Sequence, residues 1–273
     1  GEDVVQFDGK WPFVRVLGIT ELFLTLFSLG NFYVNYINFK KLRHYMRINT
    51  NHIHQSVVFS QFMLLALVNL IGWACSTIFH IRDTSITETM DYLGAGAIVI
   101  ANFNAVFVRY FDLHLVKNRI RRQWFQCGMI CLLLFHYMWL YISWDYDYNM
   151  KFNVFIGLLA AGLWILHSIR VHRLYSSGTT RKGSIYLAPY EAKITDKLRY
   201  LGITSSTYIG LIPVVLNLYL IVSVSLEFID FVPWFLLIDA HSLWHACTIL
   251  PPIIWHDWNI WELELASQDF RLP

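Results

Sequence analysis

Charged side chains are scarce in this sequence. They make up 15% of the 273 residues, whereas soluble domains usually carry about a quarter. So few charges cannot cover the surface of a soluble globular protein of this size, and the composition excludes that class. Cysteine is scarce as well, and we expect the few thiols to pack inside apolar stretches without forming disulfides. These residues are Cys75, Cys127, Cys131 and Cys247.

Apolar residues make up 56% of the chain and are gathered into long blocks. A helix needs ~20 apolar residues to cross ~30 Å of hydrocarbon, and in lipid each backbone donor must be paired within its own segment. The sequence therefore predicts an all-α membrane protein, a bundle of seven transmembrane helices. The expected spans are roughly residues 13–38, 56–80, 91–111, 123–143, 151–170, 203–226 and 233–255. Polar residues of the first span should face the bundle interior: Glu21, Asn31, Asn35 and Asn38.

The charges of the loops predict the orientation. Loops after the first, third and fifth spans are rich in Lys and Arg, while the alternate loops hold mainly Asp and Glu. Because basic loops stay cytoplasmic, we expect a lumenal or extracellular N-terminus and a cytoplasmic C-terminus. The predicted parts are a short lumenal segment (residues 1–12), a seven-transmembrane domain (13–256) with a long cytoplasmic loop (172–202), and a cytoplasmic tail (257–273). No cleavable signal is visible, so either a signal has been removed or a preceding segment is missing.

The chemistry-bearing residues come from three separate spans. Ionisable side chains inside a membrane are costly and therefore indicate function. Span seven contains His241 and His245, which are four residues apart and so project from one helix face. Span two ends at His80, with Ser76 on the same face one turn earlier. Span three is expected to start at Asp91.

Depth along the helices brings this set together. His80 and Asp91 lie at the lumenal ends of their spans. If span seven enters near Pro233, its two histidines lie ~12–18 Å below that end, and Ser76 lies ~6 Å below His80. All five residues can then occupy one layer in the lumenal half of the bundle. The topology came from loop charge alone, so this agreement supports the cluster independently.

Three neutral imidazoles with an open fourth position are typical of catalytic zinc, which activates water at neutral pH. Asp91 could orient or deprotonate that water, and Ser76 could donate a hydrogen bond to a developing oxyanion. Asp239 has two equal interpretations, as a partner that orients a histidine or as a partner of a backbone group. We interpret His136 and His167 as interhelical hydrogen-bond partners.

The pattern Ser-x3-His, then Asp, then His-x3-His resembles the CREST superfamily of membrane hydrolases, which includes alkaline ceramidases and the progestin and adiponectin receptors. Within it, the chain is most similar to the Per1-like family, the lipid-remodelling phospholipases that act after GPI attachment. The similar stretches are GKWPF (9–13), STIFHIRDTSITETMDY (76–92), DYDYNM (145–150) and DAHSLWHACT (239–248).

The resemblance implies a reaction and a place for it. Family members remove the sn-2 acyl chain from the phosphatidylinositol of new GPI-anchored proteins, in the endoplasmic reticulum of fungi and the Golgi of animals. The zinc ligands of related enzymes map onto His80, His241 and His245, with Ser76 and Asp91 completing the set. Members also tend to carry a cysteine-rich lumenal segment before the first helix, and here the residues before Trp11 contain no cysteine.

We therefore expect a zinc-dependent phospholipase A2 of the endoplasmic reticulum membrane, with the Golgi membrane as the alternative. It would convert GPI anchors to lyso-GPI and free fatty acid. Its partners would be GPI-anchored proteins and membrane lipids, with no nucleic acid. The alternatives are an amidase similar to alkaline ceramidase, because activated water attacks amides in the same way, and a seven-helix receptor in which zinc is structural.

Overall fold

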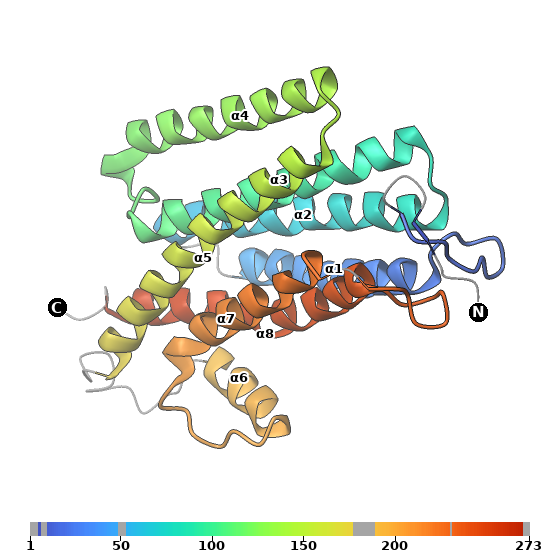
Figure 1. Ribbon diagram of the computed structural model, residues 1–273. Coiled ribbons are helices and arrows are strands. Elements are labelled where there is room, and N and C mark those ends of the chain that lie inside the picture. The colour runs from blue at the N-terminus through green and yellow to red at the C-terminus, as the bar shows by residue number, and fades with distance from the viewer. Residues whose placement is uncertain (1–4, 7–9, 49–52, 177–188, 230, 270–273) are drawn as a thin grey trace. The chain divides into compact units, whose positions relative to one another are not determined.

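A computed structural model describes residues 5–6, 10–48, 53–176, 189–229 and 231–269 (Figure 1). Within these ranges the secondary structure is helical, apart from turns and two isolated β-bridges. The α-helices are α1 (Leu22–Ile48), α2 (Ile53–Ile81), α3 (Ser85–Tyr110), α4 (Arg119–Ile142), α5 (Tyr146–Ser176), α6 (Pro189–Tyr200), α7 (Ile212–Val224) and α8 (Ala240–Asp269). Short 3-10 helices are η1 (Val116–Asn118), η2 (Ile209–Leu211) and η3 (Ser225–Glu227).

Five helical stretches are long and apolar enough to cross a membrane, and they correspond to the second to sixth predicted spans. They are Ser56–Ile81, Ser85–Tyr110, Val116–Ile142, Tyr146–Ser176 and Ile209–Glu227. The helices that correspond to the first and seventh spans, α1 and α8, carry more polar side chains and do not meet the same criterion. An all-helical fold is thus confirmed and is consistent with a membrane protein, while the count of seven spans stays a prediction.

The first predicted span begins too early. Residues 13–21 are not helical, because Val16 and Ile19 pair through backbone hydrogen bonds around a tight turn. Leu17 (φ 55°) and Gly18 (φ 83°) adopt left-handed backbone conformations there, which a right-handed helix cannot contain. Helix α1 starts only at Leu22 and then runs to Ile48. The predicted inward face of this helix is confirmed, since Asn31, Asn35 and Asn38 are all buried.

The last predicted span also begins too early, and the depth estimate that relied on it is wrong. After Pro233 the chain makes a turn with Phe235 and Leu236 at positive φ, closed by a hydrogen bond from Trp234 N to Ile238 O (2.8 Å). Helix α8 starts at Ala240, so both of its site histidines lie in its first two turns. Similarly, α3 starts at Ser85, which places Asp91 inside the helix and not at its beginning.

Two segments that were predicted as loop and tail contain helix. Helix α5 extends to Ser176, and α6 occupies 189–200 within the predicted loop 172–202. Residues 177–188 of that loop, including Arg181 and Lys182, lie outside the described residues, as do residues 1–4, 7–9, 49–52, 230 and 270–273. Helix α8 continues through most of the predicted tail 257–273, because Trp258, Trp261 and Leu263 are buried and favour a packed helix.

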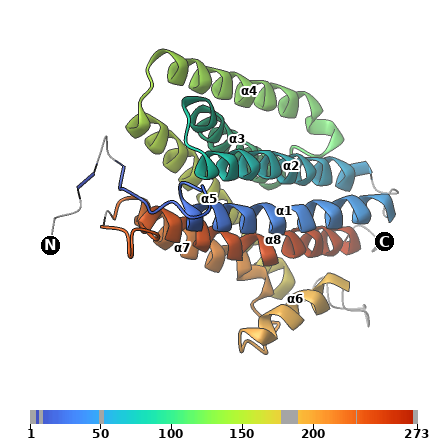
Figure 2. The same ribbon diagram turned by 90° about the vertical axis from the view of Figure 1, so that its right-hand side faces the viewer.

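The chain divides into two compact units: residues 1–160 with 220–249, and residues 161–219 with 250–273. In the first unit, α1, α2 and α3 lie side by side in both ribbon views (Figures 1 and 2). Helices α2 and α3 approach closely at two glycines, where a Cβ atom on Gly94 would lie 3.0 Å from Gly72 Cα. Small residues allow such close contact between helices in membranes. The first turns of α8 pack on α1, with Ile249 against Gly30.

The second unit has an aromatic core of its own. Trp164, Trp258 and Trp261 are almost fully buried, and the Trp258 indole donates a hydrogen bond to Ile209 O (2.9 Å). Lys197 of α6 pairs with the buried Asp257 of α8. These contacts explain why α6 and the end of α8 are ordered helices and not the open loop and tail that the sequence predicted.

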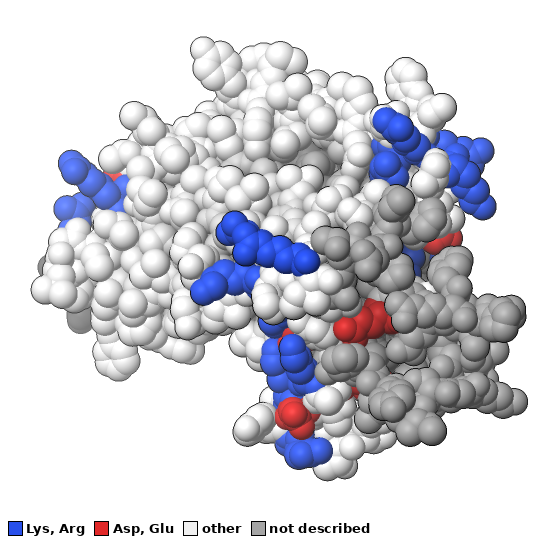
Figure 3. Space-filling model, turned by 180° about the vertical axis from the view of Figure 1, so that it is seen from behind, with Lys and Arg blue, Asp and Glu red and all other residues white. Residues whose placement is uncertain are grey.

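The surface also matches an apolar environment. Figure 3 shows Lys and Arg in separate groups, with broad areas between them that carry no charged side chain. On α4, large apolar side chains are exposed along the whole length of the helix. They include Ile120, Trp124, Ile130, Leu134 and Ile142. Exposed apolar surface of this extent is rare on soluble monomers and suits contact with lipid.

Candidate metal centre

His80 lies at the end of α2, where the chain before α1 docks onto it. The last carbonyls of a helix lack partners within the helix. Here Glu21 N donates to His80 O (3.0 Å) and Thr20 N donates to Ile81 O (3.1 Å). These two hydrogen bonds satisfy the end of α2 and fix Glu21 beside the His80 ring. The Glu21 carboxylate then forms a hydrogen bond with His80 Nδ1.

His241 and His245 are placed by a reciprocal cap at the start of α8. Asp239 Oδ1 accepts a hydrogen bond from Ser242 N (2.8 Å), and Ser242 Oγ accepts one from Asp239 N (2.9 Å). Side chains that accept from the first free N–H groups of a helix define where it begins. Of the two interpretations of Asp239, the structure supports the one in which its carboxylate binds backbone.

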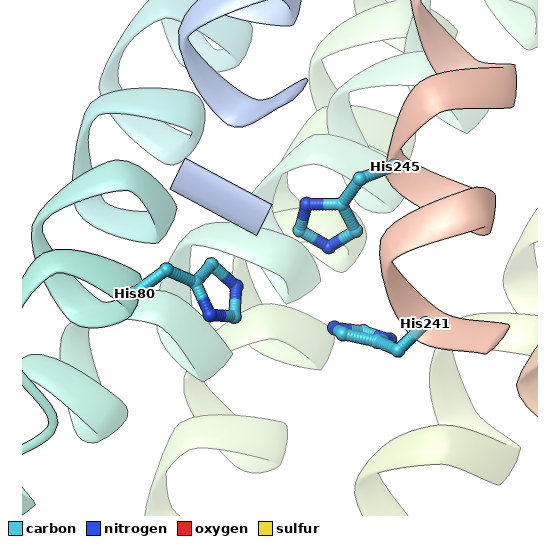
Figure 4. A group of neighbouring side chains, drawn as sticks. All are labelled: His80, His241 and His245. Carbon is cyan, nitrogen blue, oxygen red and sulfur yellow. The ribbon is translucent and has the colours of Figure 1, made fainter. Parts of the chain in front are cut away.

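The three histidines converge. Their ring centroids are 5.9 Å apart for His80 and His241, 5.2 Å for His80 and His245, and 4.5 Å for His241 and His245. One ring nitrogen from each lies within 4.8 Å of the others. Figure 4 shows the imidazoles turned toward one another, one from α2 and two from α8. His80 and His245 are buried, and His241 is partly exposed. The three side chains could together hold a metal ion.

A second set of residues forms a hydrogen bond with Nδ1 of each of the three histidine rings. His241 Nδ1 bonds Glu227 Oε1 (2.7 Å), and His245 Nδ1 bonds Ser28 Oγ (3.0 Å). Glu21 plays the same part for His80, whose Nε2 is buried with no hydrogen-bond partner. Histidines that bind metals commonly donate the other ring N–H to a carboxylate or similar acceptor. The donor set therefore fits a metal ion bound through the Nε2 atoms.

Ser76 and Asp91 complete the cluster that the sequence predicted. Ser76 is buried, and its Oγ lies 3.3 Å from Ser28 Oγ. Asp91 lies close enough to Ser76, His80 and His241 for each of them to act on its carboxyl group. A capping box at Thr84 and Thr87 starts α3 and so fixes the turn that carries Asp91. All five predicted site residues thus meet in the first unit.

Three residues of the site were missed as site residues by sequence reasoning: Glu21, Ser28 and Glu227. Glu21 was expected only to face inward, and Glu227 was counted among the acidic loop charges. For Glu21 and Glu227 the available signal was a negative charge at the edge of an apolar block, where an acid needs a partner. Ser28 gave no signal, because a serine in a membrane helix is usually a packing residue. A fourth residue, Asn31, supports the frame by donating from Nδ2 to His245 O (2.9 Å) and Thr248 Oγ1 (3.0 Å).

Comparisons with known proteins show which family this chain is similar to. Residues 1–263 match the model of the Per1-like family. The chain is 33% identical to Protein PER1 of Saccharomyces cerevisiae over 94% of its own length and 69% of that protein. It is 34% identical to the Protein PER1 homolog of Schizosaccharomyces pombe, over 89% of the chain and 63% of that protein.

An animal relative carries a functional name. The chain is 30% identical to the GPI-specific phospholipase A2-like PGAP3 of Cricetulus griseus, over its whole length and 74% of that protein. No solved structure gives a significant match. The predicted family is confirmed, and this chain belongs to the Per1-like family.

Proposed function

We propose that this protein is a zinc-dependent phospholipase A2 that acts on GPI anchors. It would hydrolyse the sn-2 acyl ester of their phosphatidylinositol and give lyso-GPI and a free fatty acid. The observation that carries the proposal is the convergence of three histidines, each held by Nδ1, beside Asp91 and Ser76. Relatives named as GPI-specific phospholipase A2-like, and as Post-GPI attachment to proteins factor 3 in Drosophila melanogaster, support the substrate.

Zinc is the metal that suits this donor set. Three imidazole ligands are the ligand set of catalytic zinc sites that keep one position open. His80, His241 and His245 would hold the ion, and Glu21, Ser28 and Glu227 would keep the rings in place. Bound there, zinc would supply Lewis acidity and activation of water at neutral pH.

Asp91 would transfer protons during the reaction, and Ser76 would donate a hydrogen bond. In the arrangement described above, the Ser76 hydroxyl lies against the Asp91 carboxyl. Asp91 would act as the base that takes a proton from the attacking water and later delivers one to the leaving alkoxide. A protonated carboxyl accepts hydrogen bonds less well. Ser76 would then be free to donate to the oxyanion that forms on the ester carbonyl.

The membrane arrangement is part of the proposal. We propose seven spans with a lumenal N-terminus and a cytoplasmic C-terminus, because the loop charges favour that orientation. The hydrolase domain would cover residues 13–256, between a lumenal segment (1–12) and a cytoplasmic tail (257–273). The active site would face the lumenal half of the endoplasmic reticulum membrane, with the Golgi membrane as the alternative.

This location suits the proposed partners, which are GPI-anchored proteins, their phosphatidylinositol lipid and other membrane lipids. An acyl chain can approach between helices from the bilayer, while the glycan and the attached protein stay in the lumen. The metal centre lies at helix ends, since His80 is the penultimate residue of α2 and His241 the second residue of α8. An ester at the boundary between headgroup and acyl chain reaches that level without leaving the membrane.

The test combines metal content with lipid turnover. Elemental analysis of the purified protein should give about one zinc per chain, and the His241→Ala/His245→Ala variant should lose it. His44→Ala, which removes an exposed histidine of α1 away from the cluster, is the matched control. Release of fatty acid from GPI-anchored proteins should stop in Asp91→Asn while zinc is retained.

Other outcomes would change the assignment. Unchanged sn-2 deacylation in Asp91→Asn or in the double histidine variant would refute the mechanism. Turnover of ceramide in place of the GPI lipid would favour an amidase. One zinc per chain with turnover of neither lipid would favour a receptor in which the metal is structural.

A further inference from the structure

Ser28 connects the metal centre to the pair of residues beside it. This α1 residue is fully buried, and its single hydroxyl lies 3.0 Å from His245 Nδ1 and 3.3 Å from Ser76 Oγ. Ser76 in turn lies close enough to Asp91 to act on its carboxyl group. Two hydrogen bonds therefore connect a ligand candidate on α8 through Ser28 of α1 to Ser76 of α2, and Ser76 lies beside the carboxyl group of Asp91 on α3.

The direction of each hydrogen bond along this path follows from proton counting. A neutral imidazole carries one N–H, so a His245 ring that binds metal through Nε2 must carry its proton on Nδ1. That N–H can only donate to Ser28 Oγ. Ser28 then has its own proton left for Ser76 Oγ, and Ser76 has its proton left for the Asp91 carboxylate. With Asp91 ionised, this assignment satisfies every group and leaves His245 Nε2 free for a metal.

We propose that Ser28 is a positioning residue that locks the His245 ring for metal binding and, through Ser76, aims Asp91 at the reacting centre. The inference deepens the proposed function and relies on it for the identity of the reaction. Neither the ligand pattern nor the resemblance to the family assigned a role to this serine. Because Ser28 accepts one hydrogen bond and donates another, the metal side and the proton-transfer side of the site share a single orienting group.

A neighbouring hydroxyl shows what a purely structural role looks like. Thr77 follows Ser76 on α2 and is also buried, but its hydroxyl donates only to Trp73 O within the same helix (2.7 Å). Such bonds hold a side chain against its own turn and do not link elements. Thr77→Val is therefore a matched control: it removes a buried hydroxyl one residue from Ser76 without touching the path.

The first measurement is zinc retention by the folded protein, in competition with a chelator. Ser28→Ala should lose zinc about 10–100-fold more readily than the unaltered chain, the usual effect of removing a partner of a ligand histidine. Ser76→Ala, which leaves the His245–Ser28 bond in place, should retain zinc nearly as well as the unaltered chain. Ser28→Thr, which restores a hydroxyl, should recover most of the retention, and Thr77→Val should show no change.

The second measurement is turnover by zinc-saturated protein. Ser28→Ala should lower kcat with little change in KM, because it misdirects Asp91 without removing a contact to lipid. Ser76→Ala should lower kcat as well, because it both misdirects Asp91 and removes the donor to the oxyanion. The double variant should lose no more than the worse single variant, since both interrupt one path. The visible spectrum of the cobalt-substituted protein should shift in Ser28→Ala and stay unchanged in Thr77→Val.

The outcomes separate the two proposals. An unaltered chain that binds no zinc or releases no fatty acid would refute the proposed function. An unaltered chain that does both, with Ser28→Ala equal to it in zinc retention and kcat, would refute the role of Ser28. Additive losses in the double variant would overturn the shared path. If Ser28→Ala does not fold, Ser28→Cys decides, because its thiol fills similar space but is only a weak hydrogen-bonding group; unchanged zinc retention and kcat in that variant would refute the role of Ser28.

Discussion

Two buried polar clusters lie in the first unit, and they differ in what they leave unpaired. The amide cluster joins α2, α3 and α4 through Gln61, Asn104 and Gln126: Gln61 Oε1 accepts from Asn104 and from Gln126, each at 2.8 Å. The histidine cluster, formed by His80, His241 and His245, has every Nδ1 paired, but His80 Nε2 is buried without a partner.

The difference distinguishes a structural network from a ligand site. Interhelical amide pairs in membranes hold helices together when their groups satisfy one another. Buried polar atoms that lack a partner carry a desolvation cost and persist where function needs them. Ring nitrogens that converge, each with Nδ1 held by a hydrogen bond, could hold a metal ion. Both clusters consist of polar side chains, so their composition does not distinguish them. What distinguishes them is that only the histidine cluster contains a buried polar atom without a hydrogen-bond partner.

The largest difference between the two clusters should appear when a candidate ligand is removed. His80→Ala should abolish zinc binding, because two imidazoles alone cannot supply the three protein ligands of a catalytic site. The counterpart in the amide cluster is Asn104→Leu, which should leave the zinc content unchanged. Elemental analysis of both proteins checks the prediction. Zinc loss in Asn104→Leu with the helices intact would mean that the two clusters are not independent.

A smaller effect is expected when a residue that forms a hydrogen bond with Nδ1 of a site histidine is changed. Glu227→Gln keeps the shape of the side chain but weakens the hydrogen bond that orients His241. Zinc retention should fall about 10–100-fold, as is usual for partners of ligand histidines. Chelator competition measures this directly. A variant that holds zinc as tightly as the unaltered chain would show that Glu227 contributes charge to the loop and no orientation to the ring.

The contact between α2 and α3 offers a test at a distance from the rings. In Gly94→Ala the new Cβ would lie 3.0 Å from Gly72 Cα, so the helices must separate near Asp91. We expect a loss of about 1–3 kcal/mol in unfolding free energy and a lower kcat with zinc retained. Gly128→Ala is the control, because nothing lies within 4 Å of its Cβ. Thermal unfolding and fatty-acid release measure the two effects, and equal behaviour of both variants would contradict the prediction.

The smallest effect should come from the amide cluster itself. Gln126→Leu removes one donor to Gln61 and leaves that oxygen bonded to Asn104. The expected cost is about 1 kcal/mol of unfolding free energy, with zinc content and kcat unchanged. Thermal unfolding in detergent measures it. A fall in zinc content would show that α4 supports the metal centre, which the contacts described above do not indicate.

Much of the fold was predictable because apolar blocks and helix length are tied together by the thickness of the membrane. The second to fifth predicted spans match α2 to α5, apart from a few residues at their ends. The starts of α1 and α8 were not predictable. Their preceding turns place Leu17, Phe235 and Leu236 at positive φ, a conformation that bulky residues seldom adopt and that no sequence signal marks.

The grouping of the candidate site residues did not depend on the exact helix boundaries. The five chemical residues meet although the depth estimate for α8 was wrong, because i,i+4 spacing fixes a helix face wherever the helix begins. The positions of the residues that form hydrogen bonds with Nδ1 of these rings depend instead on where non-helical segments pack. Glu21 reaches His80 only because Thr20 and Glu21 bind the end of α2 through their backbone, and such docking is invisible in composition or periodicity.

The hydrogen bond between Ser28 and His245 joins residues 217 positions apart, and this separation has a consequence for synthesis. A membrane chain emerges from its N-terminus, and its early helices can pack before the last one exists. Glu21, Ser28, Ser76, His80 and Asp91 are then already in place, but two of the three ring nitrogens are still missing. Under the proposed function, zinc would be captured firmly only after α8 has inserted. The metal would therefore act as a marker of completed assembly, and chains that stop before α8 would remain both empty and inactive.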